Sequence, residues 1–523
     1  MKRILCFTLS LALLFLCGCS GKSNAYTPTG DAIVPEDYSG PAITTPQDGS
    51  QQSLVMTYYP NITMNPYLCT EITNRSLFPL LYQGLFAMDR EYRTYPMLCK
   101  QYSVSEDMTQ YTIHLENATF SDGSALTGED VVASLRAAWE STVYKGRFMH
   151  ISDISAAGNV VVITLDTPME NLPLLLDIPI VKASQVAEDH PLGTGPYTLS
   201  NNGSAPCLQR RTNWWCSSVD MQIVASTIAL TKAESVTQIR DNFEFSDLNL
   251  VCADPCSDNY ADYRCDYELW DCESGMLLYL TFCKDSTVFA DPNVRAALTY
   301  AIDRDALVAQ HYRGFARSAA LPASPLFPHY SQSLANRYRY DPERFKQAIT
   351  DAGLTGSTVK LLVNKDDSLR LRAARSIAEM LEAGGLVVEL SELSGYSYRD
   401  ALTYRVFDLY LGQTRLSPNM DLSAFFHTNG NLSYGGVNDT TAYNLCLQAL
   451  ENHGNYYTLH QTVMDNGLLC PILTGSYAVY ATRGLLPGLN TARDNAFYYS
   501  LGKTMEQALI LEPPTTEPTT PAT

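Results

Sequence analysis

The chain has 523 residues, enough for two to four domains at about 150 residues each, and its 46% hydrophobic and 17% charged residues are typical of a globular protein. The formal net charge of −19 argues against the basic surface that nucleic-acid binders carry, so we expect no nucleic-acid partner. A small solute is the partner that this composition favours.

The first 19 residues have the pattern of a secretory signal. Lys2 and Arg3 precede an apolar run over residues 4–16 that is too short to span a bilayer. The ending LCGC, residues 16–19, resembles the bacterial lipobox, in which cleavage leaves a lipid-bearing N-terminal cysteine. This resemblance implies a signal peptide over 1–19 and lipidation of Cys19, with an ordinary cleaved signal as the alternative. We therefore expect lipid anchoring at the extracytoplasmic face of the cell membrane.

The two ends of the mature chain have a different composition from its body. Residues 20–50 are rich in Ser, Thr, Pro and Gly, and residues 511–523 are rich in Pro and Thr. Neither segment shows a periodic apolar pattern. Such segments cannot bury enough apolar surface to fold, so they predict a disordered tether and a disordered tail.

The sequence contains 14 cysteines, and removing Cys6, Cys17 and Cys19 leaves eleven in the mature body. An odd number without repeating spacing argues against a disulfide framework, so we expect buried small hydrophobic residues with one or two disulfides at most. Cys252, Cys256, Cys265, Cys272 and Cys283 cluster loosely but lack the paired CxxC spacing of a zinc site, and we predict no metal site.

The first half of the body alternates strand and helix signals. Residues 111–115 alternate with period two, and a Ser-Asp-Gly turn follows at 121–123. Thr127 and Asp130 have capping-box spacing ahead of apolar residues at helical intervals, which predicts a helix there. The β-branched run at 159–165 predicts another strand.

In the second half, two helices are marked by Asp-Pro pairs at 291–292 and 341–342, and Gly353 is the expected stop of the second. Then follow a strand at 360–364, a helix of about fifteen residues closed by glycines 384 and 385, and a strand at 386–390. This order predicts a parallel crossover, with a further strand at 407–412. Ligands of open α/β sheets bind at the carboxyl ends of strands, which directs attention to the loop 412–421.

Several blocks, in order along the chain, resemble the peptide/nickel-type solute-binding proteins of ABC transporters, family 5. The most specific is residues 111–135, where Phe120, Asp122, Gly123, Thr127, Asp130 and Val131 carry the match. The others are Asn65-Pro66, LLYQGLFAMD (80–89), GTGPY (193–197), VRAALTYAIDRDALV (294–308) and YDPERFKQAITDAG (340–353). One block alone would be weak, but their shared order over most of the chain is specific.

The resemblance implies an α/β, two-lobed periplasmic-binding-protein-like fold with mixed sheets and a hinge between the lobes. The first lobe would comprise residues 51–272 and the return segment 472–510, with an accessory subdomain at about 84–188. The second lobe would be residues 273–471. A monomer that works with ABC permease subunits is the implied assembly.

An enzyme is the less favoured interpretation. The sequence has no G-x-S-x-G, H-E-x-x-H or P-loop motif, and its eight histidines are scattered. We expect no catalytic residue and no cofactor, although a hydrolase built on this scaffold stays an alternative.

In peptide-binding members of the family, an aspartate in the loop after a second-lobe strand holds the α-amino group of the peptide. Here Ser417 stands where that aspartate is expected, and a neutral hydroxyl cannot balance a buried ammonium. Either Asp421 takes the role, or the ligand is not a free-amine peptide. Arg415 would then bind a carboxylate or another anionic group, unless it is a solvated loop charge.

The expected function is that of a lipid-anchored substrate-binding protein that captures di- or oligopeptides and delivers them to the permease of an ABC importer. The alternatives are another solute, such as an oligosaccharide or a metal chelate, and a receptor that senses a peptide signal without transport. Further candidate ligand-binding residues, from the rough register of the resemblance, are Tyr59, Asn61, Gln83, Gly84, Trp270, Gly412, Gln413 and Tyr477.

Overall fold

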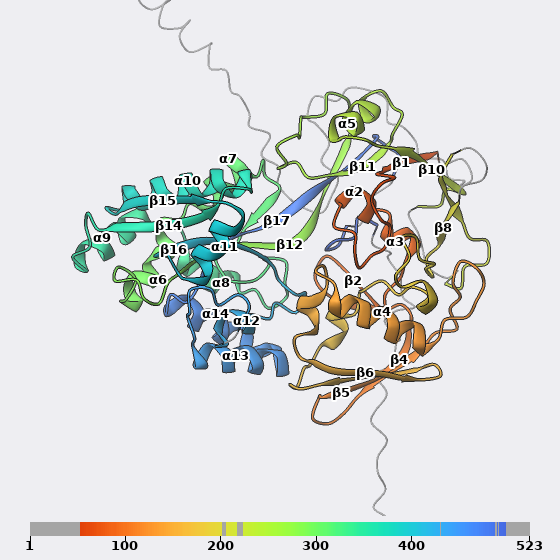
Figure 1. The fold of residues 1–523 in the computed structure, drawn as a ribbon, viewed down its shortest axis with the longest axis horizontal. Helices are drawn as coiled ribbons and strands as arrows, with labels where there is room; N and C mark the ends of the chain where they lie inside the picture. The colour runs from red at the N-terminus through yellow and green to blue at the C-terminus, as the bar shows by residue number, and fades with distance from the viewer. Residues whose placement is uncertain are drawn as a thin grey trace, which may run out of the picture.

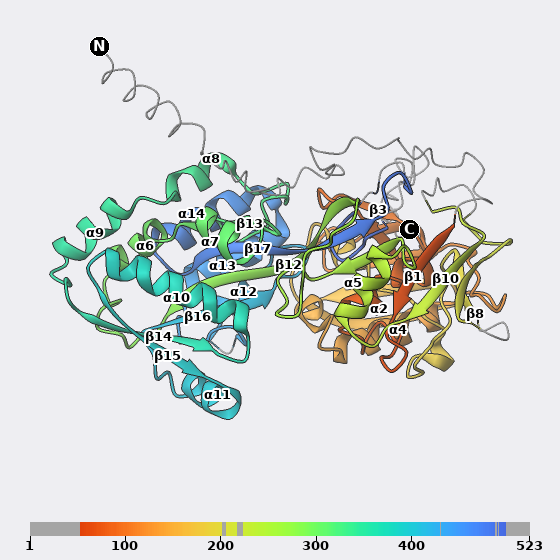
Figure 2. The same ribbon diagram turned by 90° about the horizontal axis from the view of Figure 1, so that it is seen from above.

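The structure is a computed structural model that describes residues 53–200, 205–216, 223–428, 430–486, 489 and 491–497. The predicted signal peptide, Cys19, the tether, the tail and residues 498–510 of the return segment lie outside the described residues. Two lobes lie side by side, and the long strands β12 and β17 run between them (Figures 1 and 2). No helix in the described ranges is long and apolar enough to cross a bilayer.

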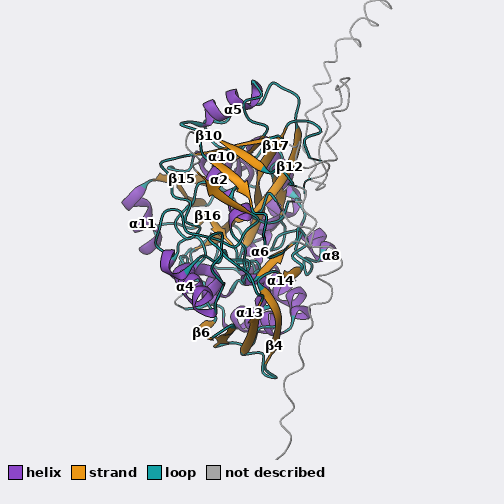
Figure 3. Ribbon diagram, turned by 90° about the vertical axis from the view of Figure 1, so that its right-hand side faces the viewer, coloured by secondary structure: helices purple, strands orange, loops and turns teal. Residues whose placement is uncertain are grey.

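The first lobe contains a sheet in the order β1-β10-β9-β8, in which β1 and β10 are parallel and the other pairs antiparallel. Its strands are β1 (Leu54–Tyr58), β8 (Tyr197–Ser200), β9 (Cys207–Arg210) and β10 (Thr227–Lys232). Its helices are α2 (Ile72–Arg75), α3 (Phe78–Leu81) and α5 (Val236–Glu244). In Figure 3, α5 and β10 lie at the opposite end of the lobe from β4 and β6.

The accessory subdomain is built on an antiparallel sheet in the order β4-β5-β7-β6. The predicted strands and helix of this region are confirmed, because β5, β7 and α4 lie where the sequence patterns place them. The elements are β2 (Phe86–Met88), β3 (Thr94–Pro96), β4 (Cys99–Val104), β5 (Gln110–Leu115), α4 (Gly128–Glu140), η2 (Lys145–Phe148), β6 (Ile151–Ala157), β7 (Val160–Leu165), η3 (Leu172–Leu175) and η4 (Ala183–Gln185).

A seven-stranded sheet in the order β11-β17-β12-β16-β14-β15, with β13 paired to β17, begins in the first lobe at β11 and continues into the second lobe. The predicted parallel crossover is confirmed, since β14 pairs in parallel with both β15 and β16. The strands are β11 (Leu250–Ala253), β12 (Glu268–Phe282), β13 (Ala316–Ser318), β14 (Thr358–Asn364), β15 (Val387–Leu393), β16 (Leu409–Arg415) and β17 (Cys470–Ala481).

The helices of the second lobe begin at the caps that the sequence indicates. Asp291 accepts a hydrogen bond from the backbone N–H of Asn293 (2.8 Å), and Asp341 accepts one from that of Arg344 (3.0 Å). The helices are α6 (Pro292–Ala301), α7 (Arg304–His311), α8 (Gln332–Ala335), η5 (Asn336–Tyr338), α9 (Pro342–Asp351), α10 (Ser368–Ala383), α11 (Gly395–Thr403), α12 (Ser423–Phe426), α13 (Thr440–Glu451), η6 (His453–Asn455) and α14 (Tyr456–Asp465).

Two predicted strands end later than expected, of which the first is β15, expected at 386–390 and ending at Leu393. The strand expected at 407–412 is β16, which runs from Leu409 to Arg415, so the expected loop 412–421 begins inside a strand. The reason is tertiary: β16 pairs with the second half of β12, from Phe282 opposite Leu409 to Met276 opposite Arg415. This pairing extends the strand past Gly412, where the sequence pattern alone ends it.

The crossing strand β12 belongs to both lobes. Residues Glu268–Glu273 pair with β17, next to β11 of the first lobe, and Met276–Phe282 pair with β16 of the second. The register shifts between these halves, and Gly275 there has a φ of 71°, a conformation that glycine adopts without strain. Asp271, 1% exposed, binds Arg90 of the accessory subdomain (2.7 Å) and Arg317 of the second lobe (2.5 Å).

No disulfide forms among the described residues, where the sequence analysis allows one or two. All eleven cysteines in these ranges are free, and most of them are buried. They act as small apolar side chains, as the sequence analysis expects. Nor does any group of three His, Cys, Asp or Glu side chains in this part of the chain gather at metal-binding distances.

The cap of α4 gives a first testable prediction. Asp130 accepts hydrogen bonds from the backbone N–H and hydroxyl of Thr127 (2.9 and 2.7 Å) and from the backbone N–H of Ala183 (2.8 Å). We expect Asp130→Ala to lower the free energy of unfolding by about 1–2 kcal/mol, because buried donors lose their acceptor. Chemical denaturation measures this, with Glu129→Ala as the control, because Glu129 is exposed on the same turn. Equal effects of the two substitutions would contradict it.

Candidate functional site

A cavity of about 430 Å³ lies between the lobes, against the crossing strands. Its walls come from α2 and β11 on the first-lobe side, from β12 and β17 in the middle, and from α10 and β16 on the second-lobe side. The lining residues are Thr70, Glu71, Ile72, Thr73, Val236, Ile239, Cys252, Ala253, Asp254, Cys256, Ser257, Tyr263, Ser274, Met276, Leu278, Tyr312, Phe315, Leu369, Gln413, Leu473, Gly475, Ser476 and Tyr477. We call this the main cavity.

The charged groups of the main cavity are acidic. Glu71 caps α2 by accepting hydrogen bonds from the backbone N–H and the hydroxyl of Thr73 (3.1 and 2.9 Å), and Asp254 accepts one from the backbone N–H of Cys256 (2.9 Å). Burial, together with the charges of Asp367 and Glu71, raises the pKa of Asp254. The described lining contains no lysine or arginine. This arrangement suits a ligand that brings a cationic group.

Two of the sequence-predicted residues line the main cavity. Gln413 lies on β16, facing the space from the second lobe, and Tyr477 lies on β17. Burial raises the pKa of Tyr477 well above its ordinary value, so its hydroxyl stays protonated and able to donate a hydrogen bond. The two side chains reach the cavity from β16 and β17, which pair with opposite edges of β12.

Gln83 and Gly84 line a smaller cavity of about 90 Å³ instead, together with Arg75, Arg147 and Arg493. Gln83 is 4% exposed, and its amide oxygen accepts a hydrogen bond from Trp215 (2.9 Å). Arg415 is close to this cavity and forms an ion pair with Asp494 of the return segment. It is therefore not a solvated loop charge.

Five other predicted residues do not line the main cavity. Tyr59 is partly buried, and its backbone N–H donates to Asn74 (2.7 Å); Asn61 is exposed. Trp270 is 1% exposed within the core, and Gly412 packs against the ring of Tyr279. Ser417 donates a hydrogen bond to Asn419 (2.6 Å) within its own loop.

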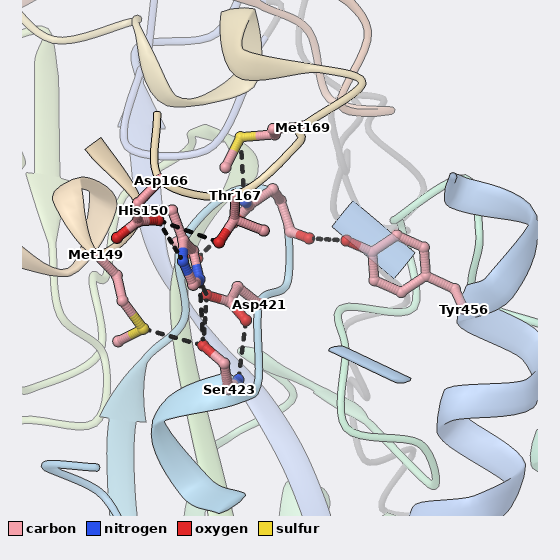
Figure 4. A network of polar contacts seen from close by, with 10 residues as sticks. Met149, His150, Asp166, Thr167, Met169, Asp421, Ser423 and Tyr456 are labelled. Atoms are coloured by element: carbon pink, nitrogen blue, oxygen red, sulfur yellow. Dashed lines mark hydrogen bonds and ion pairs between the residues drawn. The ribbon is translucent and has the colours of Figure 1, made fainter. Parts of the chain in front are cut away.

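Asp421 lies outside the main cavity and holds the two lobes together (Figure 4). One of its oxygens is 3.1 Å from Nε2 of His150 in the accessory subdomain. Its oxygens also accept hydrogen bonds from the backbone N–H (2.8 Å) and the hydroxyl (2.9 Å) of Ser423 at the start of α12. These partners occupy the carboxylate, so an amine-binding role would require it to exchange them.

The contact around His150 is broad. The hydroxyl of Ser423 donates to the sulfur of Met149 (2.9 Å; Figure 4), and the backbone N–H of His453 donates to the carboxylate of Glu170 (2.9 Å). Nearby, the backbone N–H of Glu170 donates to Leu450 on α13 (2.8 Å). The accessory subdomain is thus fastened to α12–α14 of the second lobe.

Burial and charge oppose one another at the His150–Asp421 pair. Burial alone lowers the pKa of His150, but the hydrogen bond and charge of Asp421 and the charge of Asp166 outweigh it and raise the pKa. Likewise, burial raises the pKa of Asp421, and the hydrogen bond and charge of His150 reverse this to a net lowering. The pair is therefore ionic at mildly acidic pH.

Sequence reasoning missed Glu71, Asp254 and His150. Glu71 precedes a helix of only four residues, too short to give a periodic pattern, and Asp254 and His150 belong to no motif. An N-cap search would not have found Glu71, because Ser, Thr, Asp and Asn are the preferred N-cap residues and glutamate is not among them.

Two comparisons of sequence relate this chain to known proteins. The profile of bacterial extracellular solute-binding proteins, family 5 (middle), matches residues 93–433. The glutathione-binding protein GsiB of Shigella flexneri is 25% identical over 356 residues, which cover 63% of this chain and 67% of GsiB.

Solved structures share the two-lobed fold. The oligopeptide-binding protein AppA of Bacillus subtilis, in complex with a nonapeptide, superposes with a TM-score of 0.57 at 18% identity, covering 82% of this chain and 94% of AppA. NikZ of Campylobacter jejuni, in complex with Ni(L-His), superposes with a TM-score of 0.59 at 18% identity, covering 85% of this chain and 96% of NikZ. The expected fold class is confirmed by these likenesses.

The His150–Asp421 pair predicts a pH-dependent stability. Because the pKa of His150 is raised above 6.5, the contribution of its charge to the free energy of unfolding is complete below that pH and is lost as the pH rises through the raised value. Because the pKa of Asp421 is lowered, the contribution of its charge to the free energy of unfolding remains at pH values above 3.8. We expect His150→Gln to lower the free energy of unfolding by about 1–3 kcal/mol at pH 5.5 and by less at pH 9.

Chemical denaturation at both pH values measures the difference. His114→Gln, on β5 of the same subdomain, is the matched control. A loss of stability in His150→Gln that does not change with pH would show that packing, and not the ion pair, is what the substitution removes.

Proposed function

Because this chain belongs to the bacterial extracellular solute-binding proteins of family 5, we propose that it captures di- or oligopeptides between its lobes and delivers them to the permease of an ABC importer. The observation that carries the proposal is the main cavity, which both lobes line and which the crossing strands floor. A solute there contacts both lobes at once, so its binding free energy favours the closed arrangement over the open one.

The lining of the main cavity supports a peptide as the ligand. Apolar walls such as Ile239, Met276 and Phe315 suit side chains, while Ser274, Gln413 and Tyr477 offer hydrogen bonds to a backbone. Glu71 and Asp254 would balance the α-ammonium, a role that Asp421 takes in one of the two alternatives from the sequence. GsiB and AppA, by their names, bind glutathione and oligopeptides.

We also propose a cellular location for the protein. Lipid on Cys19 would keep a monomer at the extracytoplasmic face of the membrane, within reach of the permease, and the protein would catalyse no reaction. A metal chelate is the second candidate ligand, because NikZ was solved with Ni(L-His) and an acidic lining also suits a cationic complex.

Blocking the main cavity tests the proposal. We expect calorimetric titration of the wild type with short peptides to give micromolar or tighter dissociation constants, and Gln413→Trp to weaken them at least about tenfold, because an indole fills part of the cavity. Gln347→Trp, on the exposed face of α9, is the matched control. Retained affinity in Gln413→Trp, at an unchanged thermal midpoint, would place peptide binding elsewhere.

The amine-binding role has its own test. Glu71→Gln should weaken a free-amine peptide by about three- to tenfold while leaving its N-acetylated form less affected, because only the former brings a buried ammonium. Asp421→Asn should leave the ratio of the two affinities unchanged. The reverse pattern would return the role to Asp421.

A further inference from the structure

The segment between β11 and β12, residues 254–267, forms one wall of the main cavity. It contains no helix or strand, and both of its ends leave from the sheet that joins the lobes. Four of its residues line the cavity: Asp254, Cys256, Ser257 and Tyr263. We call residues 254–267 the strap.

Tyrosines anchor the strap on α5 and β17. Tyr263 is buried, and the centre of its ring lies 5.2 Å from that of Phe243 on α5 and 4.3 Å from that of Tyr480 on β17. The hydroxyl oxygens of Tyr260 and Tyr480 are 2.5 Å apart. Packed aromatic rings bury a large apolar area, so this part of the strap is firmly held.

Carboxylates of the strap reach the second lobe. Asp258 accepts hydrogen bonds from the hydroxyl of Ser368 (2.5 Å) and from the guanidinium of Arg372 (3.1 Å), both on α10. Asp262 forms an ion pair with Arg313, which follows α7 (2.7 Å). The strap is thus bonded to two separate elements of the second lobe.

The bonds to the second lobe are open to water. The side chain of Asp258 is 61% exposed and that of Asp262 is 81% exposed. Nearby, the buried Cys256 packs into the core of the second lobe, and its thiol donates to the backbone carbonyl of Tyr312 (3.5 Å). Exposed ion pairs are weak and screened by salt, and a cysteine buries little apolar surface. The strap therefore separates from the second lobe more readily than from α5 and β17.

The turn after α7 holds Arg313 against the strap. Arg313 has a φ of 52°, a left-handed conformation that residues other than glycine seldom adopt, and its guanidinium lies 4.9 Å from the centre of the Tyr260 ring. Strained backbone persists where surrounding contacts stabilise it. This geometry favours a built contact over a chance pairing of surface charges.

We propose that the strap is a gate through which the ligand enters and leaves the main cavity, latched to the second lobe by Asp258 and Asp262. The proposal rests on the proposed function, and it deepens that function by separating ligand exchange from movement of the whole lobes. The ion pairs of Asp271 and the pair of His150 with Asp421 are buried, so they persist while the exposed latch opens.

The latch is separate from the ligand-binding surface. The lining of the main cavity within the described ranges includes neither Asp258 nor Asp262. Loss of either carboxylate therefore removes no contact with a ligand in this cavity. A latch of this kind changes the rates of exchange more than the affinity.

Stopped-flow measurement of Ala-Ala-Ala binding, followed by the fluorescence of the protein's tryptophans, tests the gate. Asp258→Asn should raise the association and dissociation rate constants at least about threefold each and change Kd less than about twofold, because the same ion pair is lost with and without ligand. Asp266→Asn, which removes an exposed charge from the strap beside β12, is the matched control. Unchanged rate constants in Asp258→Asn would overturn the gate.

Two further variants separate a gate from movement of the lobes. Arg372→Gln should match Asp258→Asn, and the double variant should exchange ligand no faster than the faster single one, because both substitutions remove the same ion pair. His150→Gln loosens the contact at the accessory subdomain and should leave both rate constants within about twofold of the wild type. A rise as large as that in Asp258→Asn would show that the lobes separate as a whole, which overturns the strap as the gate.

Labelling of Cys256 tests the latch without any ligand. This thiol is 6% exposed, so N-ethylmaleimide should modify it when the strap is open. By mass spectrometry, Asp258→Asn should label at Cys256 at least about threefold faster than Asp266→Asn, while Cys446 on α13 keeps its rate. Equal rates at Cys256 would overturn the latch even if peptides bind. If no short peptide binds, the proposed function fails, and faster labelling at Cys256 still supports the latch.

Discussion

The continuity of β12 is the constraint on which the rest of this structure depends. One half of the strand pairs with β17, which on its other edge pairs with β11 of the first lobe. The other half pairs with β16 of the second lobe. Backbone hydrogen bonds in these ladders fix both halves, so freedom between the lobes is concentrated at the register shift around Gly275. The main cavity lies against this point, so a rotation there would tilt its first-lobe wall relative to its second-lobe wall.

Buried ion pairs join the two lobes at two places. Asp271 on β12 binds one arginine from each side of the crossing, so its ion pairs join the lobes at their centre. Farther out, His150 and Asp421 join them at the accessory subdomain. Buried pairs of this kind add little stability beyond apolar residues of similar size, but they are specific, because breaking one leaves an uncompensated charge. They therefore define one relative position of the lobes.

Local patterns predicted the elements of this family 5 protein well. Caps at Asp291 and Asp341, the capping box of α4 and the glycine-bounded crossover all depend on neighbouring residues, and the structure confirms each of them. The end of β16 was misjudged because its last residues are held by β12, more than a hundred positions away in sequence. The site suffers more from this limit: Gln413 and Tyr477 were found through register with the family, whereas Glu71 and Asp254 come from segments that only the folded chain brings together.

The fastening between His150 and Asp421 is on one side of the crossing strands. The main cavity borders α5 and α10, which lie across β12 and β17 from α4 and α13 in Figure 1. A solute that entered or left past α5 and α10 would not disturb the contacts of the accessory subdomain. The lobes would then stay in contact on the side of the accessory subdomain, and the solute would pass through the opposite side of the molecule.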